Sequence, residues 1–113
     1  TKKGKFKDYY YEDENYFVVS SDKSTHKVVY IENNQMINKL NLKTNKNIGI
    51  GSTKKEVISE YGDKYKKMNS DKYGKLILYT DKNKNIKLGF ALNDKGKVSV
   101  IVVYDYKTYD YQW

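Results

Sequence analysis

The stretch around residues 53–61 contains the only clear helix signal in the chain, which leaves strands and loops for the rest of the fold. Thr53 is followed three residues later by Glu56, the spacing of a capping box, in which each side chain accepts a hydrogen bond from the other residue's amide. Gly62 then supplies a residue that can take the left-handed conformation that ends a helix. One helical face is apolar and is formed by Val57, Ile58 and Tyr61. We therefore predict one main short helix over residues 53–61.

A chain of 113 residues has the size of one domain, so we expect a single domain over 1–113. Charged residues make up 32%, but an aromatic content of 15% separates this chain from a disordered one. The 13 tyrosines fit a pleated surface on which the ring packs and the hydroxyl stays hydrated. Composition therefore favours strands around the single helix.

Short β-rich runs bounded by turn residues predict an antiparallel sheet of about five or six strands, with the helix packed on one face. This is the α+β class. Residues 37–42 fit either a strand or an irregular segment, and 63–72 either a turn of helix or an edge strand. The clear strand candidates are 16–19, 27–31, 75–80, 86–92 and 98–104.

The last three strand candidates predict a meander after the helix. In 86–92 the large apolar residues alternate with Lys87, Gly89 and Ala91, the pattern of a half-buried strand. The run 98–104 is apolar on both faces, which predicts the central strand. Gly96 in the turn before it is expected to have a positive φ.

The chain divides into a flexible lead-in (1–7) and a helix-plus-meander unit (47–104). The hairpin of 16–31 resembles that of 89–101, since both have an aromatic entry, an Asp/Lys turn and a lysine before the return strand. Residues 9–46 are therefore a candidate degenerate copy of the same unit.

The formal net charge is +8, and all 22 basic residues are lysine. Proteins that read bases or clamp phosphates normally use the planar fork of arginine for part of that work, so nucleic acid is not the expected partner. A solvated lysine surface is favoured, with a polyanion binder as the alternative function. The absence of cysteine excludes disulfides and thiolate chemistry.

No apolar run approaches the ~20 residues that cross a bilayer. The chain starts at Thr1, from which we expect a processed start and a removed signal or lipid-anchor segment.

Four motifs resemble chemical sites without completing them, so we expect no catalytic, cofactor or metal residues. Gly49-Ile50-Gly51 lacks the remaining residues of both phosphate-binding fingerprints and fits a tight turn before a helix. Asp81-x-Asn83-x-Asn85 lacks the glycine and glutamate of a calcium loop and fits a polar hairpin turn. The other two are the solitary His26 and the adjacent acids Asp8, Glu12, Asp13 and Glu14.

The C-terminal aromatic residues are the candidate binding surface. Exposed aromatic clusters often mark binding surfaces, and stacked rings bind sugars or unpaired bases. The alternative is an edge strand whose rings cover the sheet. The residues are Tyr104, Tyr106, Tyr109, Tyr111 and Trp113.

The helix stretch 48–62, followed by Phe90, the turn 93–98 and Ile101, resembles domains of the β-lactamase-inhibitor-protein type and the small outer-membrane-assembly lipoproteins. The resemblance covers about 47–104 and implies a non-catalytic bacterial envelope protein, secreted or lipid-anchored. The lysine- and asparagine-rich composition resembles that of lipoproteins from low-GC Gram-positive bacteria. The paired cysteines of the inhibitor are absent, so β-lactamase inhibition is not implied. The expected function is a binding domain, not an enzyme, that contacts a protein or an anionic wall polymer outside the cell.

Overall fold

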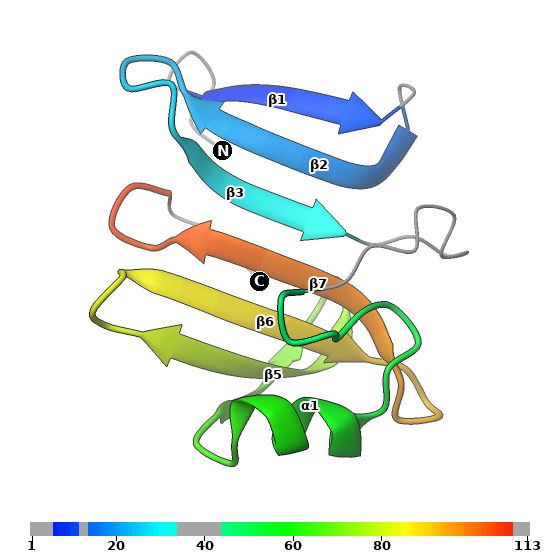
Figure 1. Ribbon diagram of the computed structural model, residues 1–113. Helices are drawn as coiled ribbons and strands as arrows, with labels where there is room; N and C mark the ends of the chain where they lie inside the picture. The colour runs from blue at the N-terminus through cyan, green and yellow to red at the C-terminus, as the bar shows by residue number, and fades with distance from the viewer. Residues whose placement is uncertain (1–5, 12–13, 34–43, 110–113) are drawn as a thin grey trace.

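The computed structural model describes residues 6–11, 14–33 and 44–109, which form one antiparallel sheet and one short helix (Figure 1). This confirms the α+β class. The sheet has seven strands in the order β1-β2-β3-β7-β6-β5-β4, one more than the upper end of the expected number. The elements are β1 (Phe6–Tyr11), β2 (Glu14–Asp22), β3 (Val28–Asn33), α1 (Lys54–Tyr61), β4 (Lys66–Ser70), β5 (Gly74–Asp81), β6 (Ile86–Leu92) and β7 (Val98–Asp105).

The most apolar strand, β7, lies at the centre of the sheet, as its sequence predicts. It pairs with β3 on one side and with β6 on the other. Val102 contributes to one core cluster and Ile101 to a second, so β7 is buried on both faces. We name the two faces of the sheet the Val102 face and the Phe90 face after their fully buried residues.

Strand β6 is buried on both faces around Phe90, so the prediction of a half-buried strand is wrong. Phe90 is fully buried in one cluster and Ala91 is fully buried in the other, while Ile86 and Leu88 are only half-buried. The small residues Gly89 and Ala91 are therefore core positions, because small side chains allow close packing on the Val102 face.

The helix begins as the sequence predicts. The Thr53 side chain accepts a hydrogen bond from the Glu56 amide at 3.1 Å, and the Glu56 carboxylate accepts one from the Thr53 amide at 2.9 Å. Val57 is fully buried, in the same cluster as Phe90 and Ile77. Gly62 ends the helix with φ 96° and ψ −179°, so its φ is positive but its ψ is extended, not left-handed helical as expected.

The structure assigns a conformation to one of the two segments for which the sequence left alternatives. Residues 66–70 form the edge strand β4, while the uncertain segment 37–42 lies outside the described residues. Strand β1 begins at Phe6 and so includes the last two residues of the expected lead-in. The meander of β5, β6 and β7 is confirmed, and Gly96 has a φ of 73°.

Candidate functional site

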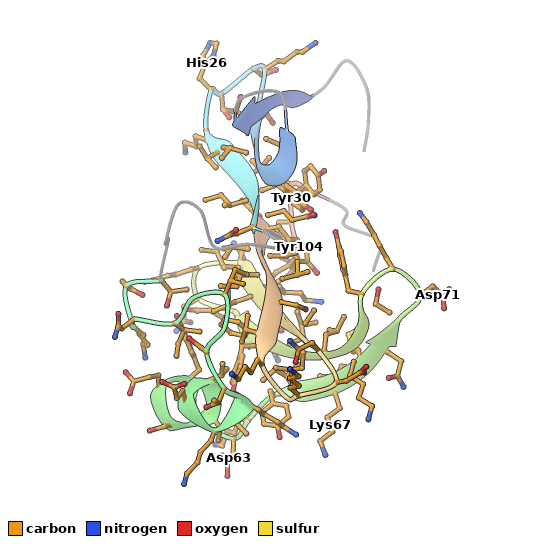
Figure 2. All side chains as sticks on the ribbon, turned by 90° about the vertical axis from the view of Figure 1, so that its right-hand side faces the viewer. His26, Tyr30, Asp63, Lys67, Asp71 and Tyr104 are labelled. Atoms are coloured by element: carbon orange, nitrogen blue, oxygen red, sulfur yellow. The ribbon has the colours of Figure 1, made fainter. Side chains whose placement is uncertain are left out.

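Two of the predicted aromatic binding residues are part of the core. Tyr104 is 5% exposed and Tyr109 is 2% exposed, and both lie in the cluster on the Val102 face. Tyr109 stacks on Tyr30 with ring centroids 4.7 Å apart (Tyr30 and Tyr104 are labelled in Figure 2). Their rings therefore cover the sheet, as in the alternative interpretation of this pattern, but Tyr104 lies on the central strand β7 and not on an edge strand.

The third aromatic residue, Tyr106, remains half-buried against the same cluster. Lysine ammonium groups approach its ring, with Lys87 Nζ at 5.3 Å and Lys107 Nζ at 5.6 Å from the centroid. Tyr111 and Trp113 lie outside the described residues.

The glycine loop before α1 uses its amides within the fold. Gly51 N donates to Val98 O at 2.8 Å, and Lys54 N donates to Gly96 O at 3.0 Å. The Thr53 amide donates to the Glu56 carboxylate in the capping box. A phosphate cradle needs such amides to point at the ligand, so this loop instead ties α1 to the β6–β7 turn.

The calcium-like pattern forms the expected polar turn. The Asp81 carboxylate accepts from the amides of Asn83 and Lys84 at 3.0 and 3.1 Å. His26 is exposed in the β2–β3 turn. Of the predicted acids, Glu12 and Asp13 lie outside the described residues. Among the described residues, no three His, Cys, Asp or Glu side chains gather as a metal site would require.

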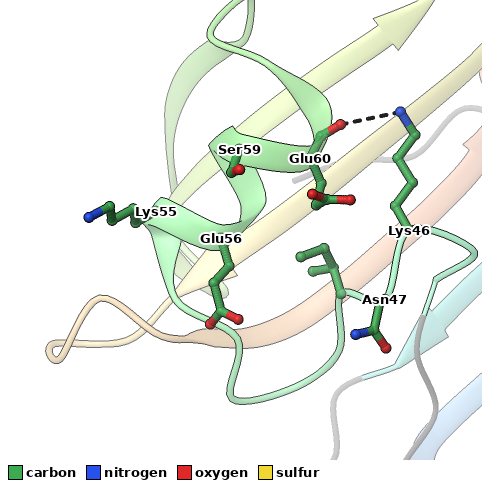
Figure 3. Close-up of a pocket in the computed structure, with 7 residues that line it drawn as sticks. Lys46, Asn47, Lys55, Glu56, Ser59 and Glu60 are labelled. Carbon is green, nitrogen blue, oxygen red and sulfur yellow. Dashed lines mark hydrogen bonds between the residues drawn. The ribbon is translucent and has the colours of Figure 1, made fainter.

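A cleft of about 380 Å³ lies between α1 and the loop before it (Figure 3). Lys46 Nζ donates to the carbonyl oxygen of Glu60 at 3.2 Å and also lies 5.1 Å from the Tyr61 ring centroid. Glu56 is held by the capping box at the start of α1, and Lys46 contacts the end of α1. These two charged side chains therefore stabilise the ends of the helix. The cleft is lined by Lys46, Asn47, Ile48, Lys55, Glu56, Ser59 and Glu60.

A buried carboxylate that the sequence analysis missed lies on β3. Glu32 is 6% exposed and its carboxylate accepts hydrogen bonds from two phenols. The Tyr30 hydroxyl donates to Oε1, and the Tyr73 hydroxyl donates to Oε2 at 2.7 Å. The sequence contains one indication of this contact, the spacing Tyr30-x-Glu32, which puts both side chains on the same face of a strand. With both oxygens engaged, the carboxylate links β3 to the β4–β5 turn.

The described large apolar side chains most open to solvent lie on β3, on the Phe90 face of the sheet. Val28 is 56% exposed and Ile31 is 36% exposed. Ile31 pairs with Val19 on β2 and with Val103 on β7, and Val103 pairs with Leu88 on β6. These residues form a cross-strand row, which together with Val28 we call the Ile31 patch: Val19, Val28, Ile31, Leu88 and Val103.

A β-bulge brings Val28 onto this face. Ser20 pairs with Tyr30 but Ser21 pairs with Val28, so Val29 is an extra residue on β3. Val29 and Tyr30 are consequently both buried in the cluster of the Val102 face, while Val28 lies on the same face as Ile31. In Figure 1, α1 and the loop before it lie near β5, β6 and β7. The described residues contain no second helix that could lie over β1, β2 or β3.

Comparisons with protein-family models, curated proteins and solved structures found no match to this chain. No helix in the described part of the chain is long and apolar enough to cross a membrane.

Proposed function

We propose that this chain is a non-catalytic binding domain that contacts a partner protein through the Ile31 patch. The observation that carries the proposal is the exposure of Ile31, in a cross-strand row whose other apolar members are half-buried, and of Val28 beside it. Contiguous exposed apolar surface is uncommon on soluble domains and tends to mark interaction sites. β-Branched residues on a paired strand also lose little side-chain entropy on binding.

The chemistry of the patch favours a protein over a wall polymer. Its side chains are aliphatic, so they offer neither the hydrogen-bonding groups nor the free aromatic rings that recognise sugars. A net charge of +8 disfavours a second copy through mutual repulsion and steers an acidic partner towards the surface. The proposed partner is therefore a protein with an apolar contact surface and an overall negative charge.

An extracellular or cell-surface location is part of the proposal and derives from the family resemblance. Fractionation of the source cells tests it separately, since a cytosolic pool alone would contradict the location while leaving the contact surface intact.

We further propose that α1 packs on the Phe90 face. The burial of Val57 and the 5.5 Å separation of the Tyr61 and Phe90 rings support this packing. Faster amide exchange in α1 of a Phe90→Ala variant is the expected sign.

Site-specific photo-crosslinking tests the contact surface. A photoreactive amino acid placed at Ile31 in the full chain, within the source cells, is expected to give discrete protein adducts. The same amino acid at Asn69, an exposed position on the edge strand β4, is expected not to give them. Identical adducts at both positions, adducts only with copies of this chain, or none at Ile31 would overturn the proposal.

A pair of charge variants provides the matched control. Val28→Asp places a carboxylate in the patch at its most exposed position, and Asn69→Asp places one at the far edge of the sheet. Both change the net charge by one unit. Val28→Asp is expected to remove the Ile31 adducts and Asn69→Asp to retain them, with circular dichroism showing that both variants are folded.

A further inference from the structure

The β5–β6 turn and the end of β7 meet at one end of the sheet. Tyr106 N donates to Asn85 O at 3.1 Å, and Ile86 pairs with Asp105. Lys87 is the register partner of Tyr104, so it lies on the Val102 face. Leu88, the next residue of β6, lies on the Phe90 face. This end of the sheet uses different side chains from the Ile31 patch.

Two lysines and one tyrosine define the Tyr106 site, Lys87, Tyr106 and Lys107, and the exposed Lys82 and Lys84 belong to the β5–β6 turn beside it. Two of the ammonium groups are held near one ring, Lys87 Nζ at 5.3 Å and Lys107 Nζ at 5.6 Å from the Tyr106 centroid. The attraction between a cation and the ring face stabilises each ammonium near the ring. Two positive charges are thereby held around one ring.

The carboxylates at this end of the sheet are used in turns. The Asp81 carboxylate accepts from two backbone amides of the β5–β6 turn. Asp105 Oδ1 accepts from Lys107 N at 3.0 Å and from Thr108 N at 3.3 Å, and Oδ2 accepts from the Thr108 hydroxyl at 3.3 Å. Neither aspartate forms an ion pair with a lysine of the Tyr106 site among the residues that the structure describes.

We propose that the Tyr106 site binds a linear phosphate polymer without bases. Ammonium groups that share one ring and have no ion-pair partner attract an anion, and a polymer releases counterions for each lysine it contacts. Lysine acts as a point charge without the planar fork of arginine, so the site recognises charge density and not a base or a fixed ligand shape. The Tyr106 ring already contacts two ammonium groups, which disfavours stacking of a base on it.

Titration of the full chain with fluorescently labelled inorganic polyphosphate at low and rising salt tests this site. The variant Lys87→Gln/Lys107→Gln removes the two ring-associated charges. The control Lys95→Gln/Lys97→Gln removes two exposed charges at the opposite end of β6. Both double variants lower the net charge by the same amount, so any difference between them reports the location of binding.

The Lys87/Lys107 variant is expected to bind about tenfold more weakly. The slope of log K against log salt should fall by roughly 1.5, because two phosphate contacts are lost. The control variant is expected to bind within about twofold of the original chain, the difference that loss of general charge attraction produces. Equal loss in both variants, or in neither, would overturn the site.

Three further ligands test the class of polymer. Single-stranded DNA, poly-glutamate and vesicles of phosphatidylglycerol are each expected to bind more weakly than polyphosphate at equal charge concentration. Tighter binding of any of them would overturn the assignment to a base-free phosphate polymer. The Val28→Asp variant is expected to bind polyphosphate normally, so failure here and failure of the protein-contact proposal are separate results.

Discussion

At the residue scale, the hydroxyl of Tyr79 links β5 to the end of α1. It donates to the carbonyl oxygen of Gly62 at 2.7 Å, and its ring contacts those of Tyr61 and Tyr65 at 5.6 and 5.7 Å. Burial raises the pKa of Tyr79 above 10.0, and the neighbouring Tyr65, Asp63 and Tyr61 raise it further. The neutral phenol is therefore the form that the fold stabilises.

This raised pKa predicts a loss of stability at high pH. Below pH 10.0 the phenol is neutral in both the folded and the unfolded chain, and its contribution is fully present. Above that pH the unfolded chain loses its proton first, so the free energy of unfolding falls until the folded phenol also ionises. Tyr79→Phe removes one hydrogen bond and should cost about 1 kcal/mol at pH 7. Urea denaturation should show this difference shrinking above pH 10.0, and a difference constant with pH would contradict it.

Residue-scale signals in the sequence predicted the helix well because they act over a few positions. The capping box of Thr53 and Glu56 depends on residues three apart, and it forms as expected. The binding surface was predicted less well, since burial of Tyr104 and Tyr109 depends on distant parts of the chain. Tyr109 stacks on Tyr30, and a spacing pattern within the C-terminal segment does not contain that contact.

At the element scale, strands with a clear apolar pattern were predictable and those without one were not. The run Val98–Asp105 is apolar on both faces and forms the central strand. The sequence of β4, KKMNS, has little apolar character, and its strand conformation comes from pairing with β5. The Ile31 patch was missed because one extra residue, Val29, changes which side chains of β3 face outward.

The β4–β5 turn is joined to a strand that is not its neighbour in the sheet. Two strands, β7 and β6, lie between β3 and β5. The Tyr73 hydroxyl nevertheless reaches the Glu32 carboxylate at 2.7 Å, so the sheet curls enough to bring the turn back towards β3. Figure 2 shows the turn at Asp71 and the helix on opposite sides of the sheet. Curling of this kind lets one sheet enclose its own core.

Removal of that link should loosen the β4–β5 hairpin. Tyr73→Phe deletes the donor to a buried carboxylate and should cost about 1–3 kcal/mol, the range for leaving a charged acceptor less satisfied. Amide exchange should accelerate most in β4 and β5. Tyr65→Phe is the control, because its hydroxyl has no hydrogen bond among the described residues, and it should cost under about 0.5 kcal/mol. Equal effects of the two variants would show that the link contributes nothing.

At the scale of the whole molecule, the two core clusters share the same three strands. The cluster of the Val102 face contains Leu76, Ala91 and Val100, and the other contains Ile77, Phe90 and Ile101. Each of β5, β6 and β7 thus contributes to both sides. One cluster cannot lose its packing while the strands that carry the other remain in place, so we expect one cooperative unfolding transition.

Two core variants test this coupling. Phe90→Ala truncates a fully buried ring on the Phe90 face and should cost about 3–5 kcal/mol. Val102→Ala truncates a fully buried side chain on the other face and should cost about 1–3 kcal/mol. In each variant, far-ultraviolet circular dichroism and tyrosine fluorescence should report the same lowered midpoint. A variant that splits the two signals would show that the clusters lose their packing separately, against the expected coupling through β5, β6 and β7.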